Sequence, residues 1–435
     1  LVRHPAAMAA YMPAASWYVL SVLLAPTGYV IQDAVADAMS VEAVPRVDKD
    51  GQPLSDAMTK SLHTTMQTFG RIALISGFVA VASVNIFLFD GVAAMDQSAK
   101  AAVYARVYLL ALLIPVISVS GVMLASYLRW RHRRALRSQG LSETEIERLL
   151  DVRDEATTPN FWYFGGGLAF VAMTLLIGLT SPPLAQEIVF AGSMAIVLFL
   201  MVRLIKELAP DRARVLVGTA IIIFVFRAVP LPGAGATWFE IDVLGFDQQF
   251  LAVLSLLASL LTLAGMIILR PMMASRSIAD VVIILTLAAG VLSIPNIALY
   301  YGIYQWTAPL TGGIVDARFI AVIDTAMESP LGQIAMIPML AWIAKNAPSH
   351  LKATFFAVMA SFTNLALSAS SLLTKYLNQI FTVTREVRDR ASGEITTTAD
   401  YSLLGWLLIT VAIISVAAPL IAVFVIQRSA LKTNE

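Results

Sequence analysis

Four carboxylates lie in segments that are otherwise apolar enough to cross a membrane. Asp33 and Asp37 are near the end of one segment, and Asp324 and Glu328 lie inside another. Each pair is spaced by four residues, which places both carboxylates on one face of a helix. A charge at membrane depth costs about 2.5–3.5 kcal/mol on insertion scales, so it needs a partner, a cavity or a function. Substrate binding and proton coupling are the candidate functions, and for the first pair wetting at the headgroups is the alternative.

Three cations lie within or beside apolar segments. Arg227 interrupts the run IIIFVFRAVPLPGAGATWFE, just before a break rich in proline and glycine. An arginine there could clamp a substrate carboxylate through two hydrogen bonds. Lys375 lies near the outer end of its segment, and Arg71, which opens its own segment, is a candidate gating residue. The alternative is that Arg227 or Lys375 forms a structural ion pair with the second carboxylate pair.

Aromatic residues gather near the predicted outer ends of several helices, among them Trp238, Tyr301 and Trp306. One interpretation is an interfacial belt, in which amphipathic rings lie at the level of the headgroups. The other is a stacking surface for a flat heterocycle.

One predicted helix, near residues 352–380, carries many polar side chains. They are Ser361, Thr363, Asn364, Ser368, Ser370, Ser371 and Thr374. So many hydroxyl groups are expected either to line an aqueous path or to pack on small-residue neighbours.

The composition sets the frame for these residues. The 435 residues are 58% hydrophobic and 14% charged, with a mean hydropathy of +0.77, whereas soluble domains carry about 25% charged residues. The chain is therefore expected to be an all-α, multi-pass membrane protein. Eleven spans of about 20 apolar residues are predicted. They lie near 14–38, 67–90, 101–128, 161–181, 185–206, 212–232, 248–270, 278–303, 317–345, 352–380 and 402–427.

Several function classes are disfavoured. The net charge of +1 gives no support for nucleic-acid binding. The absence of cysteine excludes disulfides and iron–sulfur clusters. The four histidines are expected in loops or at helix ends, without metal-ligand spacing: His4, His63, His132 and His350. No cofactor, no metal and no enzymatic activity are expected.

The orientation follows from the arginines after the third span, since positive charge favours the cytoplasmic side. This places residue 435 in the cytoplasm and residue 1 outside, in what we expect to be a bacterial plasma membrane. Within the same basic linker, Ser142 and Glu145 have the spacing of a helix N-terminal capping box. Because the chain opens at Leu1 with no signal peptide, we expect further helices to precede it.

Three stretches resemble the folate–biopterin transporter family, a branch of the major facilitator superfamily. QDAVADAMSVEAVP is similar to the acidic motif of the family's fourth helix. FVFRAVPLPGAGATWFEIDVLGFDQQFL resembles its seventh and eighth helices, and ESPLGQIAMIPMLAWIAKNAPSHLKATFFAVMASFTNLA its tenth and eleventh. The matches touch most of residues 28–90 and 215–380.

The resemblance implies two six-helix bundles with binding near the midplane between them. Three helices would then be missing at the N-terminus, giving fourteen in the full chain. It divides the sequence into the remainder of an N-terminal bundle (1–128), a basic cytoplasmic linker (129–160), an inserted helix hairpin (161–206) and a C-terminal bundle (207–435).

The resemblance also implies transport of a folate, a pterin or a similar organic anion across the lipid bilayer. A carboxylate suits the amidine-like edge of the pterin ring, and cations suit the glutamate tail of folate. Alternating access coupled to protons, or to another ion, is the expected mechanism, with Asp33 or Glu328 as the coupling residue. The alternatives are the same fold with another anion or an exported drug as cargo, or a membrane enzyme acting on lipids.

Overall fold

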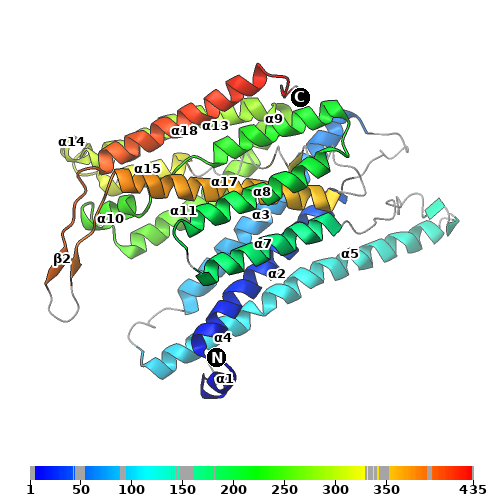
Figure 1. Cartoon of the computed structure of the whole chain (residues 1–435), viewed down its shortest axis with the longest axis horizontal. Helices are drawn as coiled ribbons and strands as arrows, with labels where there is room; N and C mark the ends of the chain where they lie inside the picture. The colour runs from blue at the N-terminus through cyan, green and yellow to red at the C-terminus, as the bar shows by residue number, and fades with distance from the viewer. Residues whose placement is uncertain are drawn as a thin grey trace. The chain divides into compact units, whose positions relative to one another are not determined.

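Helices form most of the part of the chain that the computed structural model describes (Figure 1). The structure describes residues 5–42, 54–88, 95–138, 161–180, 182–328, 352–388 and 394–433, with isolated positions between these ranges. The N-terminal helices are α1 (Pro5–Tyr11), α2 (Ala14–Glu42), α3 (Asp56–Leu88), α4 (Gln97–Ala111) and α5 (Leu113–Ser138).

The later helices begin with a hairpin, α7 (Phe161–Thr180) and α8 (Ala185–Ile205). There follow α9 (Pro210–Arg227), α10 (Ala234–Asp242), α11 (Gln248–Ile268), α12 (Arg270–Ser275), α13 (Ile278–Tyr300), α14 (Tyr304–Leu310), α15 (Ala317–Glu328), α17 (Lys352–Ile380) and α18 (Leu404–Gln427). Two short antiparallel strands, β1 (Val387–Arg388) and β2 (Ile395–Thr397), join α17 to α18.

Each of the eleven predicted spans contains a helix, the ninth being described only as far as the end of α15. Six helical stretches among the described residues are long and apolar enough to cross a membrane: Ser98–Ser138, Phe161–Gly178, Ala185–Ile205, Ile278–Tyr300, Thr354–Ile380 and Leu404–Gln427. A helical membrane protein is thereby supported, and the β1–β2 hairpin is an addition to the expected all-α fold.

Two predicted boundaries differ from the structure for physical reasons. The third span is broken into α4 and α5 at Leu112. Pro115 explains the break, because it has no amide hydrogen to donate and its ring collides with the carbonyl four residues earlier. Helix α3 begins eleven residues before the predicted start at residue 67, because its first turns are polar and escape a search for apolar runs. His63 lies within this extension of α3 and is buried, where a loop or a helix end was expected.

The chain divides into two compact units. The first comprises residues 1–33 and 77–158, and the second comprises residues 34–76 and 159–435. In the first unit, α4 packs against α5. Gln32 of α2 also donates a 2.8 Å hydrogen bond to the hydroxyl of Ser118 in α5.

The core of the second unit lies among α8, α9, α13, α17 and α18. Its fully buried side chains include Leu204, Leu216, Ile222 and Met359. The hairpin helices pack in sequence, α7 on α8 and α8 on α17, as Figure 1 also shows. The hairpin at 161–206 therefore lies directly on the helices that follow it.

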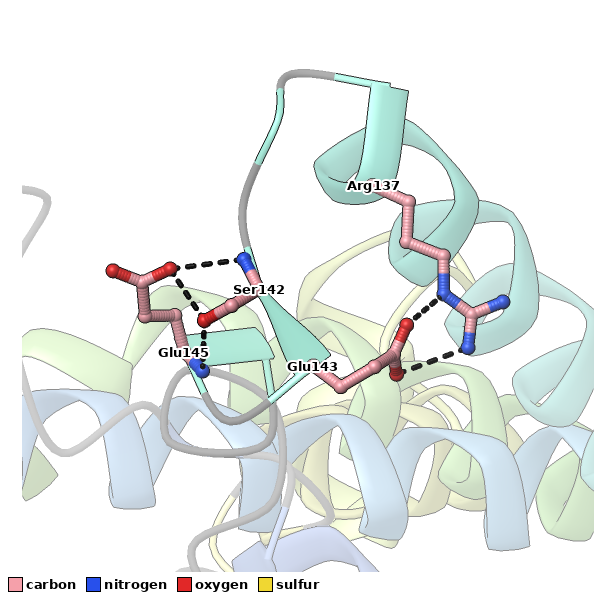
Figure 2. Close-up of polar contacts among 4 residues, drawn as sticks. All are labelled: Arg137, Ser142, Glu143 and Glu145. Carbon is pink, nitrogen blue, oxygen red and sulfur yellow. Dashed lines mark hydrogen bonds and ion pairs between the residues drawn. The ribbon is translucent and has the colours of Figure 1, made fainter.

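The predicted capping box in the basic linker is confirmed (Figure 2). The Ser142 amide donates to the Glu145 carboxylate at 2.9 Å, and the Glu145 amide donates to the Ser142 hydroxyl at 3.4 Å. Arg137, at the end of α5, forms a two-pronged ion pair with Glu143, which lowers the pKa of that carboxyl. The linker thus begins with a defined turn after the basic end of α5.

Candidate functional site

The polar side chains of α17 form two stripes on different faces of the helix. One stripe recurs every three or four residues and lines a cavity: Ser361, Asn364, Ser368, Ser371 and Lys375. The other stripe contacts the connection between α9 and α10. The second face thus bonds the backbone of a neighbouring connection, where packing on small residues was expected.

The second stripe consists of Ser370, Thr374 and Asn378, spaced four residues apart. Ser370 donates to the carbonyl of Val229 at 2.6 Å, and Thr374 accepts from the amide of Leu231 at 2.9 Å. Asn378 donates to the carbonyl of Pro232 at 3.2 Å. The proline-rich break leaves these backbone groups outside a helix, and the stripe satisfies them, as the low-dielectric surroundings require.

The cavity has a volume of about 1300 Å³ and lies between the α7–α8 hairpin and α17. This exceeds the usual small-molecule cavity of about 300–1,000 Å³, so a ligand of folate size can be accommodated. Most of its wall is apolar, with Phe170, Ile177, Val189, Phe190, Val197 and Leu200 from the hairpin. Gly166 permits close packing of α7 on α8, because an added Cβ there would lie 2.9 Å from Leu200 Cδ1.

The α17 hydroxyl groups in the wall of the cavity offer hydrogen-bond acceptors. Ser361 donates to the carbonyl of Ala357 at 2.8 Å, and Ser371 donates to that of Leu367 at 3.0 Å. Their hydroxyl hydrogens are thereby used within the helix, and their oxygen lone pairs remain available to a ligand. Asn364 adds a carboxamide that both donates and accepts. This wall suits a ligand whose edge carries amino or amide hydrogens.

One charged cluster involves the cavity. Lys375, which lines the cavity, forms a 2.7 Å ion pair with Glu187 of α8. The hydroxyl of Tyr376 donates to the same oxygen, Glu187 Oε1, at 2.7 Å. Glu187 lies in the first turn of α8, a position at which the helix N-terminus favours a negative charge. Glu187 was not predicted as a site residue, although an acid in the first turn of an apolar helix is the signal that could have identified it.

Arg227 and Arg71 belong to the same unit and lie close enough for their like charges to interact. Arg227 is the last residue of α9 and is partly buried. Asp324 lies on α15 and is buried. Two neighbouring guanidinium groups make this part of the unit attractive to an anion.

The remaining predicted carboxylates are only partly described. Asp33 lies on α2 with a partly exposed side chain, in the first unit. The side chains of Asp37 and Glu328 lie outside the described residues. Their roles, like those of the other predicted site residues, stay predictions.

Comparison with known proteins identifies the family. The model of the BT1 family matches residues 6–434. This chain belongs to the BT1 family. A folate-biopterin transporter of Synechocystis sp. (strain ATCC 27184 / PCC 6803 / Kazusa) is 25% identical over 170 residues, which are 38% of this chain and 33% of the relative. No solved structure matches the chain.

The chain thus matches about a third of the length of the curated relative. The resemblance inferred from the sequence is confirmed at the level of the family. Together with the six apolar helical stretches, it makes the chain a multi-pass integral membrane protein.

The aromatic cluster in this BT1 family member is centred on Phe239, which was not among the predicted stacking residues. Phe239 contacts the rings of Tyr300 and Tyr401, with centroids 5.2 and 5.7 Å apart. Tyr301 packs edge-on against Tyr300, and its side chain is largely exposed. Trp306 on α14 is also exposed, and Trp238 on α10 is partly buried. A stacking role for Trp238, Tyr301 and Trp306 stays a prediction.

An ion-pair network that sequence analysis missed connects α10 with the α17–α18 connection. Asp242 accepts hydrogen bonds from Arg385 at 2.6 and 2.9 Å and from the Tyr401 hydroxyl at 2.7 Å. Arg385, followed by Tyr401, lowers the pKa of Asp242. Burial and the bond to Asp242 raise the pKa of Tyr401 to about 12. The network fixes the base of the β1–β2 hairpin to the end of α10.

Proposed function

We propose that this protein is a secondary active transporter of folates or pterins that works by alternating access. The observation that carries the proposal is the polar stripe of α17, which lines a 1300 Å³ cavity among apolar helices. Membership in the BT1 family and a relative named as a folate-biopterin transporter support the same function. They also favour a transporter over the alternative of a membrane enzyme.

The substrate class follows from the chemistry of the candidate residues. A pterin ring is flat, and one edge carries amino and amide hydrogens. The hydroxyl and carboxamide groups of α17 accept from such an edge. Asp324 and Glu328 are the predicted carboxylates for this edge, and Asp324 lies on α15, outside the lining of this cavity. Trp238, Tyr301 and Trp306 are the candidate stacking residues.

The glutamate tail of folate requires cations. Lys375 borders the cavity, and Arg227 lies near Arg71 in the same unit. A guanidinium group binds a carboxylate through two parallel hydrogen bonds, so Arg227 is the stronger candidate for a fixed contact. In this proposal Arg71 acts as a gate.

Transport is coupled to protons in this proposal. Asp33 or Glu328 carries the proton, and Asp37 assists, because a carboxylate withdrawn from water binds a proton more readily than one in solvent. The major facilitator arrangement of two bundles supplies the rocking motion. The bacterial plasma membrane is the proposed location, with the C-terminus in the cytoplasm.

The test is uptake of labelled folate and of a labelled pterin by proteoliposomes that contain the full-length protein, with and without an inward proton gradient. We expect gradient-driven accumulation that Glu328→Gln abolishes. No uptake of either compound by folded protein would overturn the substrate assignment. Accumulation of a different organic anion or of a drug would support the alternative cargo, and substrate turnover that requires a divalent metal would support a lipid-active enzyme.

A further inference from the structure

The ion pair of Glu187 and Lys375 joins the inserted hairpin to α17 at the edge of the cavity. Lys375 lines the cavity. On α8, Gln186, the residue before Glu187, also lines it. The partners are 188 residues apart in the sequence and meet at 2.7 Å. A cation that faces the cavity is therefore held by a carboxylate of the protein.

The contacts of this ion pair allow another carboxylate to replace that of Glu187 on Lys375. Glu187 Oε1 accepts from both Lys375 and Tyr376, whereas the buried Oε2 has no hydrogen-bond partner within the described part of the chain. The side chains of Glu187 and Lys375 are 20% and 36% exposed, so water and ligands reach them. Ion pairs with this much exposure are weak compared with buried ones.

Each partner also has a second source of stabilisation. Without Lys375, Glu187 keeps the bond from Tyr376 and the positive end of α8. Without Glu187, Lys375 can bind a carboxylate in the cavity, which its side chain lines. Exchange of one carboxylate for another therefore leaves no buried charge uncompensated.

We infer that Glu187 occupies, in the empty cavity, the position that the carboxylate of an anionic substrate takes on Lys375. This inference rests on the proposed function and assigns to it a recognition step. When a substrate with a carboxylate tail enters, Lys375 transfers its hydrogen bond from Glu187 to that tail. Glu187 is thus a positioning residue that competes with the substrate.

The exchange distinguishes two classes of ligand. Folate carries carboxylates and can replace Glu187, whereas a pterin without a carboxylate cannot. Removal of the charge of Glu187 should therefore strengthen folate binding only, because Lys375 is then available without competition. A purely structural role would change the binding of both ligands together.

The experiment measures equilibrium binding of labelled folate and of a carboxylate-free pterin to the full-length protein in detergent. The variants are Glu187→Gln, Lys375→Gln and both together. Glu207→Gln is the matched control, since the same change is made just beyond the other end of α8. Monodisperse elution and an unchanged circular dichroism spectrum show that each variant is folded.

We expect Glu187→Gln to tighten folate binding several-fold and to leave pterin binding unchanged. Lys375→Gln should weaken folate binding by about tenfold, the usual effect of losing a hydrogen bond to a charged group. In that background, Glu187→Gln should have no further effect on folate. The control should match the wild type for both ligands.

Two results would overturn the inference while the proposed function stands. One is an equal change in folate and pterin affinity in Glu187→Gln. The other is wild-type folate affinity in Lys375→Gln. Failure of the folded wild-type protein to bind either ligand would overturn the proposed function, and the inference with it.

Discussion

The two stripes of α17 should respond differently to removal of their polar groups. One triple variant removes the stripe that bonds the α9–α10 connection: Ser370→Ala, Thr374→Val and Asn378→Ala. The other removes hydroxyl groups from the cavity wall: Ser361→Ala, Ser368→Ala and Ser371→Ala. Both variants remove three polar groups from one helix, so each is the control for the other.

The expected magnitudes follow from the hydrogen bonds. The first variant loses three bonds between different elements, each with a net value of about 0.6–1 kcal/mol, for a total of about 2–3 kcal/mol. A chain of 435 residues has an unfolding entropy of about 0.9 kcal/mol/K, so its Tm should fall by about 2–3 °C. The second variant loses bonds within one helix turn, and its Tm should change by less than about 1 °C.

The assay combines thermal unfolding of the purified protein, followed by intrinsic fluorescence, with the KM of substrate uptake in proteoliposomes. The cavity variant should raise KM with little change in Tm, and the other variant should lower Tm with little change in KM. An equal loss of Tm in both variants would refute the division of α17 into a structural and a ligand-facing stripe. An unchanged KM in the cavity variant would refute the role of the cavity.

Three further predictions concern separate parts of the chain. The pKa of Asp242 is lowered, so the stabilisation that its ion pair gives the hairpin should be complete above the unfolded pKa of about 3.9 and lost as pH falls through the lower folded value. The pKa of Tyr401 is raised to about 12, so the stabilisation from its hydrogen bond should be complete below about pH 10 and lost as pH rises through 12. Hydrogen exchange of residues 395–397, corrected for intrinsic rates, should accelerate outside that window, and unchanged protection would contradict this. Gly218→Ala would place a Cβ 2.1 Å from the carbonyl oxygen of Leu431, so limited proteolysis should cleave the chain within residues 429–433 faster than in the wild type. Asn364→Leu should raise the KM for folate and for pterin alike by about tenfold, because both present the same ring to the cavity, and a change for only one would contradict this.

Most helices could be predicted from the sequence because apolar length is a local property. The exceptions are helices, or parts of helices, that do not consist of a long apolar run. Helix α3 extends through polar turns that contain Thr64 and Gln67, both of them buried. The short helices α10, α12 and α14 and the β1–β2 hairpin lie in connections, where hydropathy carries no signal. Their positions depend on contacts such as that of Asp242 with Arg385.

The candidate site was harder to predict than the helices. The polar character of α17 was visible in the sequence, but the division into two stripes requires the position of its neighbours. Lys375 was predicted as a site residue, yet its partner Glu187 lies 188 residues away in a hairpin that the resemblance treats as surplus. Pairings between distant segments cannot be derived from spacing along the chain, because spacing defines only the faces of single helices.

The α7–α8 hairpin, which the resemblance treats as surplus to a twelve-helix plan, therefore contributes directly to the cavity. Helices α7 and α8 supply the apolar wall of the cavity opposite the stripe from Ser361 to Lys375, and Glu187 of α8 is the ion-pair partner of Lys375. Apolar residues would be expected on α17 at these positions if the stripe faced hydrocarbon. The polar stripe on α17 and the charge of Glu187 on α8 thus complement one another across the cavity. In this member of the family, the hairpin completes the wall of the cavity on which the proposed function depends.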